Sequence, residues 1–162
     1  DLKDALIFEL GQATFDARGA AEARNMAKLA DLGFRFSIDK VQTLDLDFAD
    51  LQRSDVRFIK VAADLLIEQL LDLDGAAPLP TQPDIQAADF APLTRRYGLD
   101  LIAEKVESEK QVVDILELDI GMGQGHLFGE PRAIKEAVLA ETDPPAEFVR
   151  TTLKSAEQRR RF

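Results

Sequence analysis

Residues 97–131 read YGLDLIAEKVESEKQVVDILELDIGMGQGHLFGEP, with polar residues at positions where packing alone would not place them. It opens with a short apolar run that ends in Glu104, and a second short strand leads into the glycines around Gln124. Between the two strands, apolar residues recur at helical spacing: Val112, Val113 and Leu116. Strand, helix and strand in this order predict a βα unit of parallel strands, whose carboxyl ends are where ligands bind.

The rest of the chain repeats this alternation. Strands are predicted at residues 5–10, 34–38 and 56–61, and helices at residues 16–32, 48–53, 63–73, 84–97, 133–142 and 146–162. Residues 74–83 (DGAAPLPTQP) consist mostly of prolines and small residues, which predict a flexible loop. We therefore expect one α/β domain over residues 1–162, closed by the terminal helix at residues 146–162.

The composition limits the classes of function. The chain has 46% hydrophobic residues and no cysteine, which excludes a disulfide framework or a thiolate metal site. Its net charge of −10 argues against a nucleic-acid polymer as partner, and an anionic ligand would need a local cluster of cations. A cytoplasmic domain is the default expectation. Because the sequence begins at Asp1 without a methionine, upstream residues would hold any anchor of a membrane-tethered larger protein.

Charged side chains lie at or near the ends of the predicted strands: Glu9, Asp39, Lys60 and Glu104. A lysine inside an apolar strand needs a partner, so Lys60 is expected to point toward Asp39 or Glu104. Two simpler interpretations stay open. Glu9 would then merely end an ordinary strand, and Lys60 would form a purely structural ion pair.

The motif AEKVE at residues 103–107, followed by GQGHLFGEP at residues 123–131, resembles the AEGVE and GQGY-LFG-P signatures of the EAL family. Members are cyclic di-GMP phosphodiesterases or receptors descended from them, and the narrower resemblance is to the degenerate EAL domain of TipF-type flagellar regulators. The resemblance implies a (βα) barrel of the EAL type. Such a barrel needs roughly 250 residues, so we expect this chain to cover only its later βα units, the C-terminal part.

The resemblance implies a weak or vacant metal site at Glu9 and Asp39. Lys40 stands where the family's DDFGTG motif has a second metal-binding aspartate, and an ammonium there repels a cation by about 4 kcal/mol at 4 Å and an effective dielectric of 20. The same ammonium would neutralise a phosphate oxygen; the alternative is a solvated lysine at a strand end. Three further family residues are replaced, by Gln12, Ala62 and Lys105, and the first replacement puts the family's control of the active-site loop in doubt.

The resemblance also assigns roles to the residues that are retained. Remnants of the catalytic site, not expected to be active, are Lys60, Glu104, Glu107 and Gln124. The implied ligand-binding residues are Asp39, Lys40, Lys60, Glu104, Gln124, Phe128, Glu130 and Pro131. Among them, Phe128 and Pro131 would offer apolar surface to a guanine base, and Glu130 would accept hydrogen bonds from its N1 and N2 edge.

These residues predict a catalytically impaired domain that binds cyclic di-GMP as a receptor or effector in bacterial signalling, in motility or flagellar regulation. A receptor of this kind requires no cofactor. One alternative is a slow phosphodiesterase, which would need Mg²⁺ or Mn²⁺; another is a nucleotide-free scaffold for protein interactions. The expected partners are cyclic di-GMP and proteins of a signalling or flagellar assembly, and a homodimer is left open.

Overall fold

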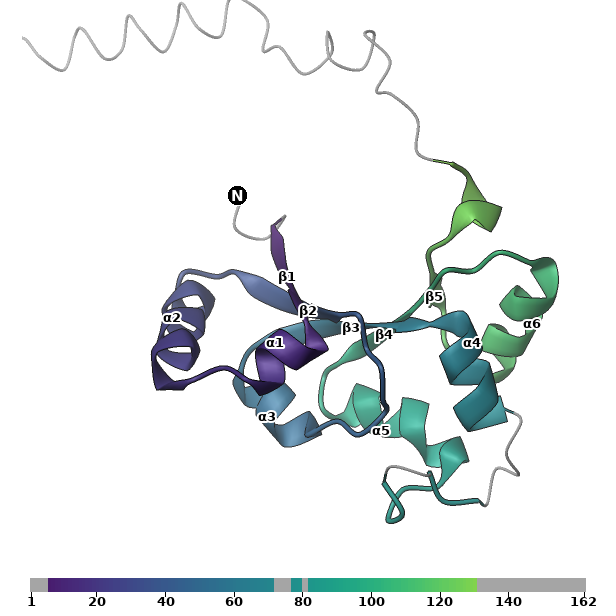
Figure 1. Ribbon diagram of the computed structural model, residues 1–162, viewed down its shortest axis with the longest axis horizontal. Coiled ribbons are helices and arrows are strands. Elements are labelled where there is room, and N and C mark those ends of the chain that lie inside the picture. The colour runs from purple at the N-terminus through teal and green to yellow at the C-terminus, as the bar shows by residue number, and fades with distance from the viewer. Residues whose placement is uncertain (1–5, 72–76, 80–81, 131–162) are drawn as a thin grey trace, which may run out of the picture. The chain divides into compact units, whose positions relative to one another are not determined.

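Five parallel strands form one sheet in chain order, β1-β2-β3-β4-β5 (Figure 1). The computed structural model describes residues 6–71, 77–79 and 82–130, which belong to the compact unit Asp1–Glu130. The strands are β1 (Ile7–Gly11), β2 (Arg35–Asp39), β3 (Val56–Ala62), β4 (Asp100–Glu104) and β5 (Met122–Gly123). All of the strands predicted from the sequence are therefore present, and an α/β fold with a parallel sheet is confirmed.

The alternation of side chains along each strand separates the core from the site. One set faces the helices α3 (Phe48–Arg53), α4 (Ala63–Leu66) and α5 (Phe90–Arg96), which lie along one side of the sheet in Figure 1. This set is buried and apolar: Phe36, Ile38, Ile59, Val61, Leu101 and Ala103. Because successive side chains point to opposite faces, the alternate set carries Asp39, Lys60 and Glu104 on the other face.

The helix predicted at residues 16–32 is present as α2 (Ala20–Asp31), which starts four residues later than expected. A separate short helix, α1 (Gln12–Asp16), precedes it and was not predicted from the sequence. Gly19 between them has an extended backbone whose N–H donates to the Glu22 carboxylate at 3.0 Å. The chain turns after α2 at Gly33, whose φ of +96° is favourable for glycine and typical of the residue that follows a helix.

The later helices lie where the sequence predicts them, but their types and bounds differ from the prediction. Helix α4 continues as a π-helix, Ile67–Leu71, and the helix predicted at residues 84–97 begins only with a 3₁₀ turn, Ala87–Asp89, before α5. Helix α6 (Glu109–Glu117) starts at Ser108, whose hydroxyl accepts from the Gln111 N–H. Its buried face carries Asp114 and Ile115, whereas Val113 and Leu116 are more than half exposed.

The described part of the 74–83 segment is anchored rather than loose. Leu79 is fully buried, Pro78 pairs with Gln86, and the Gln82 amide donates to the Leu46 carbonyl at 2.9 Å. The remaining residues of that segment, 74–76 and 80–81, lie outside the described residues, as do the helices predicted at 133–142 and 146–162. Of the helices that the structure describes, none has the length and apolar character needed to cross a membrane.

An ion pair between Arg18 and Asp50 joins the end of α1 to α3. The guanidinium also donates to the Phe15 carbonyl at 2.8 Å and stacks on the Phe15 ring. The hydrogen bond from Arg18 lowers the pKa of Asp50 below its usual value, against the opposing effect of burial. These contacts fix how the first helices sit on the sheet.

We expect Arg18→Ala to destabilise the fold by about 1–2 kcal/mol at pH 7, and by less at pH 3. The folded-state pKa of Asp50 lies below its unfolded value of about 4, so the stabilisation is complete above that value and is lost as the pH falls through the lowered pKa. Urea unfolding at both pH values measures this. Arg53→Ala is the control, since Arg53 makes only a longer, exposed pair with Asp50; an equal loss in both variants would contradict the account.

Candidate functional site

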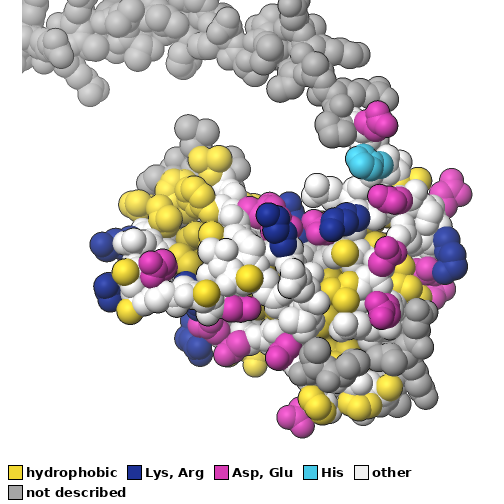
Figure 2. Space-filling model, in the orientation of Figure 1, with side chains coloured by type: hydrophobic (Ala, Val, Ile, Leu, Met, Phe, Trp, Pro, Cys, Tyr) yellow, Lys and Arg dark blue, Asp and Glu magenta, His cyan; other side chains and the backbone are white. Residues whose placement is uncertain are grey.

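The carboxyl ends of the strands bring four charged side chains to one place. Glu9 comes from β1, Asp39 ends β2, Lys60 lies near the end of β3, and Glu104 ends β4. Gln124 follows β5 at the same edge of the sheet. Figure 2 shows basic and acidic side chains next to one another near the middle of the visible face of the molecule. Strand ends separated by tens of residues in the sequence therefore form one polar cluster.

Lys60 is the cation at the centre of this cluster. Its Nζ lies 2.7 Å from Glu9 Oε2, and its side chain is only 18% exposed. The ammonium also acts electrostatically on Asp39 and on Glu104. The expectation that Lys60 needs a carboxylate partner is thus met, but the direct partner is Glu9 rather than Asp39 or Glu104. Sequence order does not reveal which carboxylate a long side chain will reach.

The carboxyl groups of Asp39 and Glu104 are shifted in opposite directions. Burial tends to raise the pKa of Asp39, but the Lys40 backbone N–H, Glu9 and the two ammonium groups of Lys60 and Lys40 bring it below its usual value. Burial raises the pKa of Glu104, and the neighbouring charge of Asp39 raises it further, while Lys105 and Lys60 partly offset this. The carboxyl group of Asp39 is therefore a stronger acid than usual, and that of Glu104 a weaker one.

Lys40 lies at the rim of the cluster rather than at its centre. Its backbone N–H donates to Asp39 Oδ1 at 2.7 Å, and its φ of +53° is unusual for a residue other than glycine. The side chain is exposed, and its Cδ would lie 4.0 Å from a Cβ placed on Gly11, so it runs back over the end of β1. Lys40 therefore lies beside the carboxylates, where a ligand from solvent would meet it.

Backbone hydrogen bonds join the segment after β4 to the segment after β5. The Gln124 N–H donates to the Ala103 carbonyl at 2.8 Å, and the Val106 N–H donates to the Gln124 carbonyl at 3.1 Å. The side chains of Gln124 and Glu107 are exposed at this edge, and the Glu107 N–H is held by Gln111 at 2.8 Å. The two sequence motifs are thus neighbours in space, as their expected roles require.

The residues expected to meet a guanine base lie at the outer end of this edge. Phe128 is 61% exposed, and its ring packs over Gly123, where an added Cβ would come within 3.2 Å of it. Glu130 is exposed as well, and Pro131 lies outside the described residues. An aromatic face open to solvent at a strand end is suited to stacking on a base.

Gln12 holds the loop at residues 40–47 in place, a contact that the sequence did not reveal. Its side chain is buried; its Nε2 donates to the Thr43 carbonyl at 3.2 Å, and its Oε1 accepts from the Gln42 N–H at 2.9 Å. From the sequence, replacement of the family glutamate put control of this loop in doubt. An amide both donates and accepts, so it satisfies both backbone groups at once.

We expect Gln12→Glu to destabilise the fold by about 1–3 kcal/mol and to loosen this loop. The carboxylate keeps the acceptor for Gln42 but sets an oxygen against the Thr43 carbonyl oxygen in a buried place. Urea unfolding and hydrogen exchange at the Gln42 amide measure the two effects. The control is Gln52→Glu on the exposed surface of α3. If Gln12→Glu behaves like this control, the two hydrogen bonds of Gln12 do not hold the loop in place.

The residues present do not fit a pair of divalent cations. Within the described ranges, no three His, Cys, Asp or Glu side chains are grouped so as to hold a metal ion. The centre of the carboxylate cluster is instead taken by the Lys60 ammonium, which repels a cation. Glu9 and Asp39 thus remain only a prediction as metal ligands.

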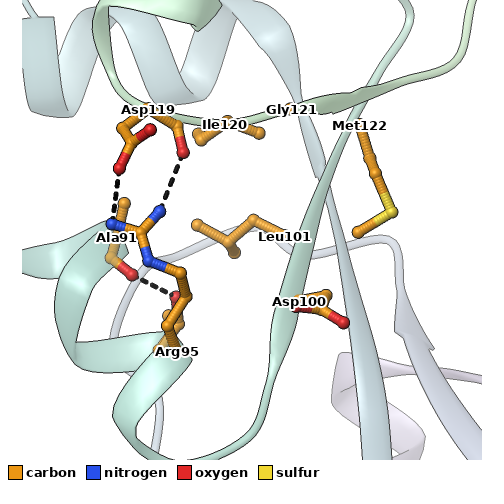
Figure 3. Close-up of a pocket in the computed structure, with 9 residues that line it drawn as sticks. Ala91, Arg95, Asp100, Leu101, Asp119, Ile120, Gly121 and Met122 are labelled. Carbon is orange, nitrogen blue, oxygen red and sulfur yellow. Dashed lines mark hydrogen bonds and ion pairs between the residues drawn. The ribbon is translucent and has the colours of Figure 1, made fainter.

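A cavity of about 260 Å³ lies near the opposite ends of β4 and β5 and is separate from this site. Figure 3 shows Arg95 on one side, directed toward Asp119, with Leu101 and Met122 also lining the cavity. Arg95 pairs with the Asp119 carboxylate at 2.6 Å and with its carbonyl at 2.9 Å. Its charge is already matched, so this cavity does not replace the strand-end cluster as the candidate site.

Comparison with solved structures shows the same fold. The PaMucR phosphodiesterase in a c-di-GMP complex is 24% identical, with a TM-score of 0.61 over 83% of this chain and 51% of that chain. The EAL domain of Mycobacterium smegmatis DcpA is 21% identical, with a TM-score of 0.59 over 88% of this chain and 61% of that chain. The Bacillus subtilis YkuI protein, in complex with its substrate c-di-GMP and calcium, is 14% identical, with a TM-score of 0.56 over 94% of this chain and 36% of that chain.

The chain thus spans less than two thirds of the length of each of these structures. No curated protein matches it. The model of the EAL domain family matches residues 1–131, which is most of the chain and includes every strand and every side chain of the strand-end cluster. The chain therefore belongs to the EAL domain family.

Proposed function

We propose that this EAL domain is a receptor for cyclic di-GMP that has lost the ability to hydrolyse it. The observation that carries the proposal is the pair of lysines beside Glu9 and Asp39. Lys40 follows Asp39 where the family motif has a second metal-binding aspartate, and Lys60 Nζ lies 2.7 Å from Glu9 Oε2. Ammonium groups beside these carboxylates weaken the binding of a divalent cation, but they attract a phosphate oxygen. The domain then still binds the nucleotide but no longer cleaves it.

Solved relatives support the class of ligand. The PaMucR and YkuI structures both contain c-di-GMP. In the proposed complex, Lys60 and Lys40 contact phosphate, Phe128 stacks on a guanine, and Glu104 and Gln124 hydrogen-bond to the ligand. The output is a contact with a protein of a signalling or flagellar assembly, as in TipF-type regulators, from a domain on the cytoplasmic side of the membrane.

A slow phosphodiesterase is the second candidate, and the raised pKa of Glu104 is the observation that favours it. A carboxyl group with a raised pKa is a stronger base, which is useful for taking a proton from water. This candidate predicts turnover that depends on Mg²⁺ or Mn²⁺.

The test uses the intact protein and has two measurements. Titration calorimetry with cyclic di-GMP in EDTA is expected to show binding at micromolar ligand. Chromatography after incubation with Mg²⁺ or Mn²⁺ is expected to show the cyclic nucleotide unchanged. Sustained formation of the linear dinucleotide would overturn the receptor proposal in favour of the phosphodiesterase, and the absence of any binding would leave a scaffold that works by protein contacts alone.

A further inference from the structure

Lys40 and Lys105 share an unusual backbone conformation at the candidate site. Each directly follows a strand-end carboxylate, Asp39 or Glu104, and each has a positive φ, +53° for Lys40 and +57° for Lys105. Side chains with a Cβ rarely adopt this left-handed region. Asp55 and Asp119 share it at other places in the chain, so what distinguishes the two lysines is that each directly follows a strand-end carboxylate of the candidate site.

The two lysines follow two carboxylates that act on each other. The charge of Asp39 acts on Glu104, while Lys40 acts electrostatically on Asp39 and Lys105 on Glu104. Their strands, β2 and β4, are separated only by β3, so the two backbones stand about 10 Å apart. The Lys40 side chain lies beside Gly11 of β1, and a flexible four-carbon side chain is long enough to turn from there toward the space between β2 and β4 when a ligand binds.

Both ammonium groups are available to a ligand. Both lysines are exposed, and among the residues that the structure describes neither is within ion-pair distance of a carboxylate. Lys60 differs from them because it is already paired with Glu9. The whole chain carries a net charge of −10 and so repels anions. Two available ammonium groups at one edge of the sheet attract an anion locally in spite of this repulsion.

We propose that Lys40 and Lys105 form a clamp that holds one phosphodiester group of the ligand between two ammonium groups, without a metal ion. The inference rests on the proposed cyclic di-GMP receptor and adds Lys105, which lies outside the ligand-binding set that the family resemblance implies. The clamp supplies by two side chains the positive charge that a cation would otherwise bring to the phosphate.

The clamp predicts opposite effects on binding and on stability. Lys105→Gly and Lys40→Gly should each weaken cyclic di-GMP binding about tenfold, the loss expected for one charge-assisted hydrogen bond. Each should leave the thermal unfolding midpoint unchanged or raise it by up to about 3 °C, because glycine tolerates a positive φ. Lys105→Gln should lose the same affinity while keeping the strained backbone. A residue with a merely structural role would lower both quantities together.

The experiment is titration calorimetry of the intact protein with cyclic di-GMP in EDTA at two salt concentrations, beside thermal unfolding. The control is Lys28→Gln on the exposed surface of α2, which removes the same charge away from the site. The clamp predicts that the control binds like the parent protein and that the lysine variants lose both affinity and salt dependence. If the parent binds and the Lys40 and Lys105 variants bind equally well, the clamp is wrong while the receptor stands. If the parent does not bind, the proposed function fails and the clamp fails with it.

Discussion

Gly125→Ala is expected to cost about 3 kcal/mol or more of stability and to abolish ligand binding. A Cβ at this position would come within 2.1 Å of the Val106 carbonyl oxygen and 2.3 Å of the Val106 nitrogen. Both atoms belong to the backbone, so no change of side-chain rotamer relieves the contact. The two segments that carry Glu104 and Gln124 would have to move apart, breaking the Val106–Gln124 hydrogen bond between them.

Gly121→Ala provides a matched control for this substitution. Gly121 directly precedes β5, and a Cβ added there meets no atom within 4 Å. Gly121→Ala should therefore leave the stability of the fold nearly unchanged. Urea unfolding gives the free energies, and titration with cyclic di-GMP gives the binding. Equal stabilities for the two variants would show that the close approach of Gly125 to Val106 is not what joins the segments.

Lys60→Met is expected to strengthen the binding of a divalent cation at Glu9 and Asp39. Removal of the ammonium takes a positive charge away from Glu9, Asp39 and Glu104, which should lower the free energy of unfolding. The loss should be only about 1–2 kcal/mol, because water still solvates Glu9 in part. A divalent cation then replaces the lost charge. Millimolar Mn²⁺ should therefore raise the unfolding midpoint of the variant and not of the parent protein.

The same variant should bind cyclic di-GMP more weakly in EDTA, since the phosphate loses one cationic partner. Lys60→Arg retains the positive charge and serves as the control, with no gain of Mn²⁺ stabilisation. Thermal unfolding with and without Mn²⁺ measures the difference. An identical Mn²⁺ response in the parent protein and in Lys60→Met would mean that Lys60 does not occupy the place of a cation.

Much of the fold follows from local sequence pattern. Strands such as residues 56–61 are short apolar runs whose alternate residues differ in polarity, and that pattern fixes both the core face and the site face. The prediction that Asp39, Lys60 and Glu104 meet followed because parallel strands bring their carboxyl ends to one edge. The structure places all three at that edge, but the ammonium of Lys60 pairs with Glu9.

The details that the sequence did not predict depend on contacts between distant segments. The periodicity of α6 indicated a helix, but its rotation depends on packing, which buries Ile115 and leaves Leu116 exposed. The hydrogen bonds of Gln12 join its side chain to backbone groups some 30 residues away. Every residue type has the same backbone carbonyl, so the sequence does not indicate which backbone group a side chain will bind. Likewise, the reach of Lys60 to Glu9 spans 51 residues of chain and a whole intervening strand.

In the proposed receptor, ammonium groups and not metal ions bind the ligand. Mn²⁺ is titrated into the cyclic di-GMP complex of the intact protein, and the free ion is followed by electron paramagnetic resonance. We expect the free Mn²⁺ signal to rise in proportion to the added ion, as it does in buffer, while the nucleotide stays bound. Loss of the signal of two Mn²⁺ ions per complex would contradict it.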